Sequence, residues 1–213
     1  MTSAATRKRM AALGAAMATM VASLVLTGVG ATARTPAGAN VLTASCPGTF
    51  EYPFVHWGDS NPYVLAPGGS FEGQTGWALS GGAKTVPGNE SFGVHGTNDS
   101  KSLSIPPGGS ATSPSICTTL WYPTIRLFTT GGSLTSPLKV EVIATLPNGT
   151  VTTKQFATIA AGSSWSPTAP LLFLANFLSP TTDGVVSVQF RFTPVGGTGW
   201  KIDDVYVDPR KGS

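Results

Sequence analysis

Two adjacent carboxylates near the end of the chain, Asp203 and Asp204, have the residue type and spacing that could do chemistry. They interrupt an apolar run that reads WKIDDVYV. Successive side chains of an extended strand point to opposite faces, so Asp203 is expected to share a face with Val205 and Val207. An inward carboxylate beside two valines requires a partner, because an unpaired charge is costly to bury. A hard cation bound by oxygen atoms is one such partner, and a turn cap or an ion pair with Lys or Arg is the alternative.

The elements that position these residues are predicted to be β-strands. Apolar and polar residues alternate most clearly at 138–146 and 186–192, and the Asn148–Gly149 pair is typical of a tight hairpin turn. Turn residues recur at the spacing of a sandwich, and residues 169–178 fit either a short helix or an ordered loop. We therefore predict an all-β fold, a single jelly-roll-like antiparallel β-sandwich. The remaining predicted strands are 77–80, 92–95, 102–105, 111–117, 125–128 and 151–156.

The first 33 residues are typical of a secretory signal peptide. Basic residues at 7–9 precede an uncharged apolar stretch at 10–30, and small residues at 31–33 form a cleavage signal. Cleavage as late as residue 39 and an uncleaved anchor stay open as alternatives. Beyond residue 33, 10 Lys and Arg balance 10 Asp and Glu, and no later segment reads as a membrane span. We expect a secreted domain without net charge, which disfavours a nucleic-acid partner.

The mature chain is expected to form one domain over residues 46–209, after a flexible lead at 34–45 and before a tail at 210–213. About 180 residues is a usual length for one domain. Cys46 and Cys117 are the only cysteines, and an even pair in an exported protein favours a disulfide. Such a bridge would close a loop of about 70 residues and stabilise the fold by roughly 4 kcal/mol.

Two blocks of sequence carry a resemblance to a known family. GSFEGQTGW begins at Gly69, and WKIDDVYVDP begins at Trp200. In this order they resemble the G-x-F-E, G-W and aromatic-x-I-D-D-V-x-V blocks of calcium-containing, galactose-binding-like jelly-roll carbohydrate-binding modules, including those attached to xylanases and other glucanases. Residues 46–67 depart from those modules as an added N-terminal segment. The whole chain is also similar to exported proteins of high-GC Gram-positive bacteria, a similarity that supplies no function.

The resemblance adds Glu72, from the first block, to the candidate metal site. Calcium accepts six to eight oxygen ligands in irregular geometry, which suits carboxylates and nearby backbone carbonyls. Glu51 is a possible substitute ligand. We predict a structural Ca²⁺ ion bound by Glu72, Asp203 and Asp204.

The family binds sugars on a sheet face or in loops at one end, and both kinds of position hold candidate residues here. Polar side chains at outward strand positions could hydrogen-bond sugar hydroxyls, and adjacent aromatic residues before Pro123 could stack on pyranose rings. The alternative is that the polar residues form cross-strand ion pairs on a solvated sheet, worth at most about 1 kcal/mol each. The candidate ligand-binding residues are Trp121, Tyr122, Arg126, Glu141, Gln189 and Arg191.

Catalytic motifs are scarce. His56 and His95 lack the spacing of a zinc site, and there is no G-x-S-x-G sequence. Adjacent carboxylates on opposite faces of a strand do not form an acid–base pair. We expect a noncatalytic protein that recognises a cell-wall or environmental glycan. The alternatives are a structural or adhesive envelope protein that binds another protein, and a glycan hydrolase or lyase. Residues that could act in such an enzyme are Asp59, Glu90, His95 and Glu141.

Overall fold

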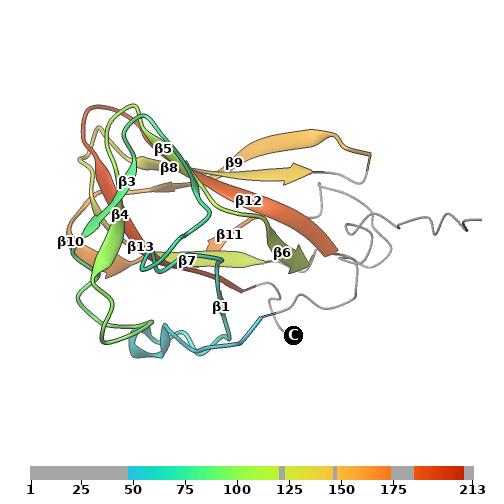
Figure 1. The fold of residues 1–213 in the computed structure, drawn as a ribbon, viewed down its shortest axis with the longest axis horizontal. Coiled ribbons are helices and arrows are strands. Elements are labelled where there is room, and N and C mark those ends of the chain that lie inside the picture. The colour runs from blue at the N-terminus through green and yellow to red at the C-terminus, as the bar shows by residue number, and fades with distance from the viewer. Residues whose placement is uncertain (1–47, 120–122, 146–147, 174–184, 209–213) are drawn as a thin grey trace, which may run out of the picture. The chain divides into compact units, whose positions relative to one another are not determined.

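The computed structural model describes residues 48–119, 123–145, 148–173 and 185–208. They form two antiparallel β-sheets packed face to face, which confirms the predicted all-β sandwich (Figure 1). Among these residues no helix has the length and apolar character needed to span a membrane. The predicted signal peptide and lead, the tail at 210–213, and Cys46, Trp121 and Tyr122 lie outside the described residues. The disulfide from Cys117 therefore stays a prediction.

One sheet, called the β13 sheet, has the strand order β10-β7-β13-β4-β3, with β1 paired to β13 and β11 paired to β7. Its strands are β1 (Val64–Leu65), β3 (Lys84–Pro87), β4 (Lys101–Ile105), β7 (Thr124–Gly131), β10 (Gly162–Pro167), β11 (Leu171–Leu172) and β13 (Trp200–Asp208). The chain reaches this sheet through the short 3-10 helix η1 (Val55–Trp57).

The other sheet, called the β12 sheet, has the order β2-β5-β12-β8-β9, with β6 paired to β12. Figure 1 shows β8, β9 and β12 in a layer above β7 and β13. The strands of the β12 sheet are β2 (Ala78–Ser80), β5 (Ser110–Thr112), β6 (Ile116–Thr119), β8 (Leu138–Thr145), β9 (Val151–Ile159) and β12 (Val185–Pro194).

The main core lies between the sheets, and the tryptophans of both motif blocks belong to it. Trp77 stacks on Phe192 with ring centroids 5.9 Å apart, and its Nε1 donates to the Pro67 carbonyl at 3.1 Å. Trp200 donates from Nε1 to the Ser136 carbonyl at 2.9 Å. A buried indole needs a partner for its N–H, and both have one. These tryptophans are structural and are not platforms for a ligand.

A second, smaller core lies on the outer face of the β13 sheet. Phe54 and Tyr63 of the N-terminal segment (residues 48–65) pack against Phe128 of β7 and Tyr206 of β13, and all four are fully buried. Figure 1 shows η1 and this segment below the β13 sheet, on the side away from the β12 sheet. The added segment is therefore an integral layer of the fold.

Two strand predictions need correction. Residues 92–95 form turns and bends in place of a strand, within a loop at residues 88–100. The predicted strand 111–117 is divided into β5 and β6, because Ser113 leaves the β5 ladder and Pro114 follows it. At 169–178 the described part forms the short strand β11, and residues 174–184 lie outside the described residues.

Candidate functional site

The two motif blocks, far apart in sequence, are joined by backbone hydrogen bonds. Val205 N donates to the Gly69 carbonyl at 3.1 Å, and Ala66 N donates to the Val205 carbonyl at 2.8 Å. A Cβ atom added at Gly69 would lie 2.8 Å from the Val205 oxygen. The first block thus requires glycine at 69 because the last strand passes directly over it.

The last strand carries a β-bulge at the two aspartates. Its pairing with β7 shifts between Asp203 and Tyr206, and Asp204 has a φ of 44°. The extra residue interrupts the alternation of side chains. Ile202, Val205 and Val207 face the main core, whereas Asp203 pairs in register with Phe128 of the outer core. The prediction that Asp203 points inward with the two valines is therefore wrong.

The loop at residues 88–100 folds over this bulge and gives its backbone N–H groups to the carboxylates. Glu90 N donates to Asp203 Oδ2 at 2.9 Å, and His95 N donates to Asp204 Oδ2 at 3.3 Å. Glu90 in turn accepts from Phe92 N and Val94 N through its own carboxylate. These bonds replace a strand ladder, which explains why residues 92–95 form no strand.

The result is a cluster of buried or half-buried carboxyl groups, called the acidic centre: Glu90, Asp99, Asp203 and Asp204. Asp203 and Asp204 are 0% exposed and Glu90 is 3% exposed. Burial raises the pKa of Asp203 to about 8 and that of Asp204 to about 7, and the neighbouring carboxylates add to both shifts. Asp204 Oδ1 has no hydrogen-bond partner. An unpartnered buried carboxylate oxygen is what a bound cation would satisfy.

Three side chains at this centre have ligand atoms close enough to share an ion. One atom each from His95, Asp99 and Asp204 lie within 4.8 Å of one another. His95 Nδ1 lies 2.7 Å from Asp99 Oδ2. Burial disfavours the charged imidazole, but the bond to Asp99 and nearby carboxylates outweigh it and raise the pKa of His95. The arrangement can neutralise its charge by protons or by a cation.

Glu72, the third predicted metal ligand, lies at the other end of the same loop. Its carboxylate accepts from Ser100 N and Lys101 N, each at 2.7 Å. Burial would raise the pKa of Glu72, but these backbone hydrogen bonds outweigh it and hold the pKa below its usual value. Among the described residues, Glu72 does not belong to the group of His95, Asp99 and Asp204, whose ligand atoms lie close enough to share an ion. The motif carboxylates therefore hold both ends of one loop, with Glu72 at its end and Asp203 near its start.

Arg126, predicted to face outward to a ligand, is 4% exposed beneath the N-terminal segment. Its guanidinium lies 4.1 Å from the centroid of the Phe54 ring, and Nη1 donates to Asp59 Oδ2 at 2.6 Å. Burial alone would raise the pKa of Asp59, but hydrogen bonds from Tyr63, Asn61 and Arg126 outweigh it and lower that pKa. The expected solvent-facing position of Arg126 is corrected, because the added segment covers that face.

The other predicted strand residues do share one face, on the outside of the β12 sheet. We call Lys139, Glu141, Gln189 and Arg191 the polar strip. Arg191 pairs in register with Glu141, donates from Nε to Glu141 Oε2 at 2.8 Å, and thereby lowers the pKa of Glu141. Lys139 Nζ lies 3.1 Å from Glu141 Oε1, and the Lys139 and Arg191 side chains keep 29% and 35% exposure. The Arg191–Glu141 pair is the cross-strand ion pair expected as the alternative, and Lys139 adds a second pair within β8. The strip still faces solvent.

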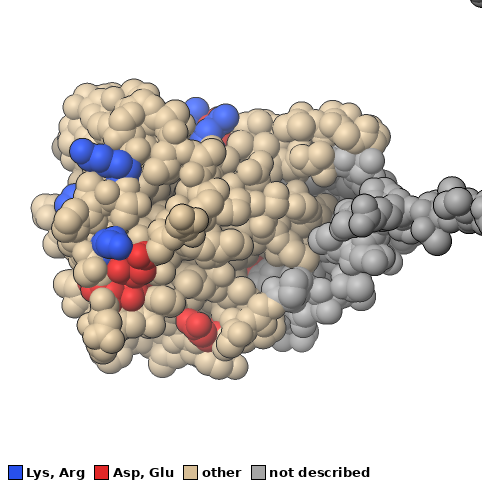
Figure 2. All heavy atoms as spheres, viewed as in Figure 1, with Lys and Arg blue, Asp and Glu red and all other residues tan. Residues whose placement is uncertain are grey.

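Figure 2 shows one face that is mostly uncharged, with acidic and basic atoms in a few small groups. Strands β2 and β5 add hydroxyls beside the strip: Ser80 Oγ and Ser110 Oγ lie 2.8 Å apart, and Thr112 stands opposite Arg191 in the ladder. The strip is thus the charged centre of a hydroxyl-bearing sheet face.

No protein-family model matches the sequence, and no similar curated protein was found. Among solved structures, the xylan-binding domain CBM22-1 of Paenibacillus barcinonensis Xyn10C is similar, with 16% identity and a TM-score of 0.45 over 68% of this chain and 93% of that domain. TmCBM61, solved in complex with β-1,4-galactotriose, has 13% identity and a TM-score of 0.42 over 68% of this chain and 98% of that one. A family 16 carbohydrate-binding module has 14% identity and a TM-score of 0.45 over 67% and 98%.

Proposed function

We propose that the protein is a secreted, noncatalytic β-sandwich that recognises a glycan through the polar strip of the β12 sheet. The observation that carries the proposal is the ordered set of donors and acceptors around Glu141. Arg191 and Lys139 hold both of its carboxylate oxygens, and their exposed nitrogens retain further donors. Gln189 is fixed by donating from Nε2 to the Ser113 carbonyl at 2.9 Å. Sugar hydroxyls both donate and accept, so a rigid strip of this kind suits them.

The acidic centre is proposed to bind a structural Ca²⁺ ion. Asp204 would direct its unpartnered Oδ1 to the ion, and Asp99 would add a second carboxylate. Asp203, Glu90 and Glu72 would hold the loop that closes over the ion, since each accepts backbone N–H groups. When bound, the ion supplies positive charge to a cluster that is otherwise hard to ionise. It thereby stabilises the motif blocks as one unit.

A hydrolase is disfavoured by where the carboxylates lie. Asp203, Asp204 and Glu90 are at most 3% exposed, and each accepts hydrogen bonds from backbone N–H groups. Groups enclosed in this way have no access to a glycosidic bond. Glu141 is tied to two cations, which lower its pKa and oppose a general-acid role.

A protein partner bound by strand addition is disfavoured by the sheet edges. The edge strand β9 has a register shift opposite Val140 and Glu141 and carries Lys154. The opposite edge, β2, has three residues, and edge strand β3 contains Lys84 and ends at Pro87. Bulges, lysines, prolines and short edge strands all oppose intermolecular pairing.

The test is the binding of the mature chain to neutral and acidic soluble polysaccharides and to peptidoglycan fragments, measured by affinity electrophoresis. Glu141→Gln and Arg191→Gln are expected to weaken binding at least about tenfold, because each removes a charge-assisted contact. Lys84→Gln, an exposed lysine of the β13 sheet, is the control. Equal binding by all variants would reject the polar strip as the site. The absence of binding by the wild-type chain would reject glycan recognition.

A further inference from the structure

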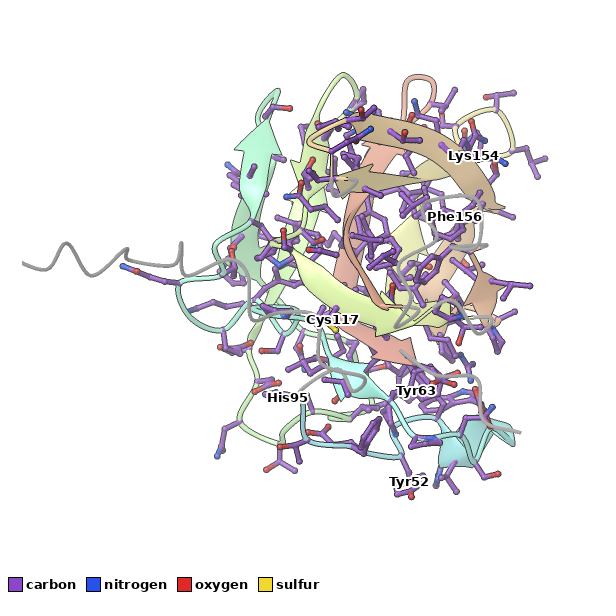
Figure 3. All side chains as sticks on the ribbon, turned by 90° about the vertical axis from the view of Figure 1, so that its right-hand side faces the viewer. Tyr52, Tyr63, His95, Cys117, Lys154 and Phe156 are labelled. Atoms are coloured by element: carbon purple, nitrogen blue, oxygen red, sulfur yellow. The ribbon has the colours of Figure 1, made fainter. Side chains whose placement is uncertain are left out.

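Exposed aromatic residues lie on the N-terminal segment and on the loop at residues 88–100, outside the polar strip. Phe50, Tyr52 and Phe92 are 39%, 60% and 47% exposed, and they are the aromatic residues among the exposed large apolar side chains of the described chain. Two belong to the segment and the third to the loop at residues 88–100 that packs against it. Figure 3 shows Tyr52, Tyr63 and His95 in the lower part of the view, with Tyr52 the lowest of the three. Aromatic exposure is thus concentrated on this side.

Three rings form a continuous set, called the aromatic row: His56, Trp57 and Phe92. The Trp57 and Phe92 rings meet edge to face with centroids 5.0 Å apart, and His56 lies 6.0 Å from Trp57. Both Trp57 and Phe92 rest on buried Phe128, at 5.3 and 5.5 Å. The row therefore stands on the second core and has an outer side open to solvent.

Hydrogen bonds of the backbone hold the row in place. Trp57 N donates to the Phe54 carbonyl and Gly58 N donates to the Val55 carbonyl, each at 2.9 Å, which sets η1. The Glu90 carboxylate accepts from Phe92 N and so fixes the loop that presents this ring. An exposed ring already held in place loses little conformational freedom when a ligand binds.

The charges around the row narrow the class of ligand. Residues 48–83 and 85–100 contain no Lys or Arg, and Arg126 beneath the segment is buried and paired with Asp59. The same stretches contain Glu51, Asp59, Glu72, Glu90 and Asp99. An acidic polymer would be repelled, whereas the apolar C–H face of an uncharged pyranose can stack on aromatic rings.

We infer that the aromatic row is a second subsite for a neutral glycan, built by the N-terminal segment and the loop at residues 88–100. The inference rests on the proposed glycan recognition and adds both a location and a ligand class to it. It also assigns a role to the N-terminal segment, which the resembling modules lack: residues 48–65 bring a stacking surface to the sandwich.

The test is Phe92→Ala in the mature chain, with Leu79→Ala as the control. Phe92 and Leu79 are 47% and 38% exposed, so both variants are expected to fold, which circular dichroism verifies. Leu79 lies in β2 of the β12 sheet, whereas Phe92 lies in the loop between β3 and β4 of the β13 sheet. The probes are soluble xylan, mixed-linkage β-glucan and galactan, with polygalacturonate as the acidic comparison. Phe92→Ala is expected to weaken binding of the neutral polysaccharide that the wild-type chain binds by about tenfold. Leu79→Ala is expected to leave it unchanged.

The outcomes separate this inference from the proposed function. Normal affinity of Phe92→Ala, with binding lost in Glu141→Gln, would overturn the subsite and leave the polar strip standing. If the wild-type chain bound polygalacturonate more tightly than the neutral polysaccharides, and Phe92→Ala weakened that binding, the assignment of a neutral glycan would be overturned. A change in sedimentation of Phe92→Ala without a change in polysaccharide affinity would assign the row to self-association and overturn the inference. Failure of the wild-type chain to bind any probe would reject the proposed function, and the subsite with it.

Discussion

The outer faces of the two sheets carry the same kind of ion pair in opposite surroundings. On the β13 sheet, Arg126 is 4% exposed and pairs with Asp59 under the N-terminal segment. On the β12 sheet, Arg191 pairs with Glu141 and its side chain keeps 35% exposure. Both arginines occupy outward positions of alternating strands. The N-terminal segment covers the first pair and encloses it, whereas the second pair stays exposed to solvent.

The two faces also differ in the sign of their charge. Carboxylates gather beside the β13 sheet, where Asp203 and Asp204 are buried. The polar strip of the β12 sheet has two cations around one carboxylate. One face thus requires a cation or protons for stability, and the other presents cationic donors to solvent. The comparison separates the residues that hold the fold from those that can contact a partner.

The largest expected effect is on stability when the buried arginine is removed. Arg126→Ala should lower the free energy of unfolding by about 3 kcal/mol, because it removes the cation beside the mostly buried Asp59 carboxylate and leaves only hydrogen bonds from Tyr63 and Asn61. Arg191→Ala should lower it by at most about 1 kcal/mol, since that pair is solvated. Urea unfolding of both variants measures the difference. Equal losses would show that the N-terminal segment does not isolate the Arg126 pair from water.

Calcium removal should have the next largest effect. Saturation at about 100 times Kd would raise the free energy of unfolding by about 2.7 kcal/mol, seen as a higher Tm with Ca²⁺ than with chelator. Asp204→Asn should abolish this rise and should stabilise the metal-free protein at pH 8, because it removes one of several buried like charges. Glu141→Gln, on the other face, should keep the full response. A wild-type Tm that is indifferent to Ca²⁺, in protein stripped of metal, would refute the ion.

The pH dependence of the metal-free protein should carry the same signature. The folded-state pKa values of Asp203 and Asp204, about 8 and about 7, lie above their ordinary value of 3.8. The folded state therefore binds more protons than the unfolded state across this window, and unfolding releases them. Stability should fall as pH rises from about 4 to about 8. Added Ca²⁺ should flatten the profile, whereas a stability that rises over this window without metal would contradict the buried acidic centre.

A smaller loss is expected where the motif blocks meet. Gly69→Ala places a Cβ atom 2.8 Å from the Val205 carbonyl oxygen, and the resulting shift should cost about 1–3 kcal/mol. Gly197→Ala is the matched control, because a Cβ there meets no atom within 4 Å. Thermal unfolding compares the two variants. The same Tm in both would mean that the contact between the blocks accommodates the extra methyl group.

Periodicity was a sound guide where a strand keeps its alternation. Strands 138–146 and 186–192 correspond to β8 and β12, and the outward residues Glu141, Gln189 and Arg191 do share a face. Periodicity was misleading at the bulge, because one inserted residue reverses the side-chain alternation beyond it. It was also misleading at residues 92–95, where hydrogen bonds from backbone N–H groups to the Glu90 and Asp204 carboxylates replace a sheet ladder.

The sequence by itself determined the all-β class, strands β8 and β12 and the two motif blocks, since these depend on local alternation and on turn residues. The tertiary structure alone decided which carboxylates meet, that His95 and Asp99 join Asp204, and that Arg126 is enclosed while Arg191 is not. The reason is physical: burial and electrostatic contact depend on which distant segments cover a face. A bulge of one residue and a covering segment of eighteen residues, 48–65, changed the surroundings of side chains that local sequence treats as equivalent.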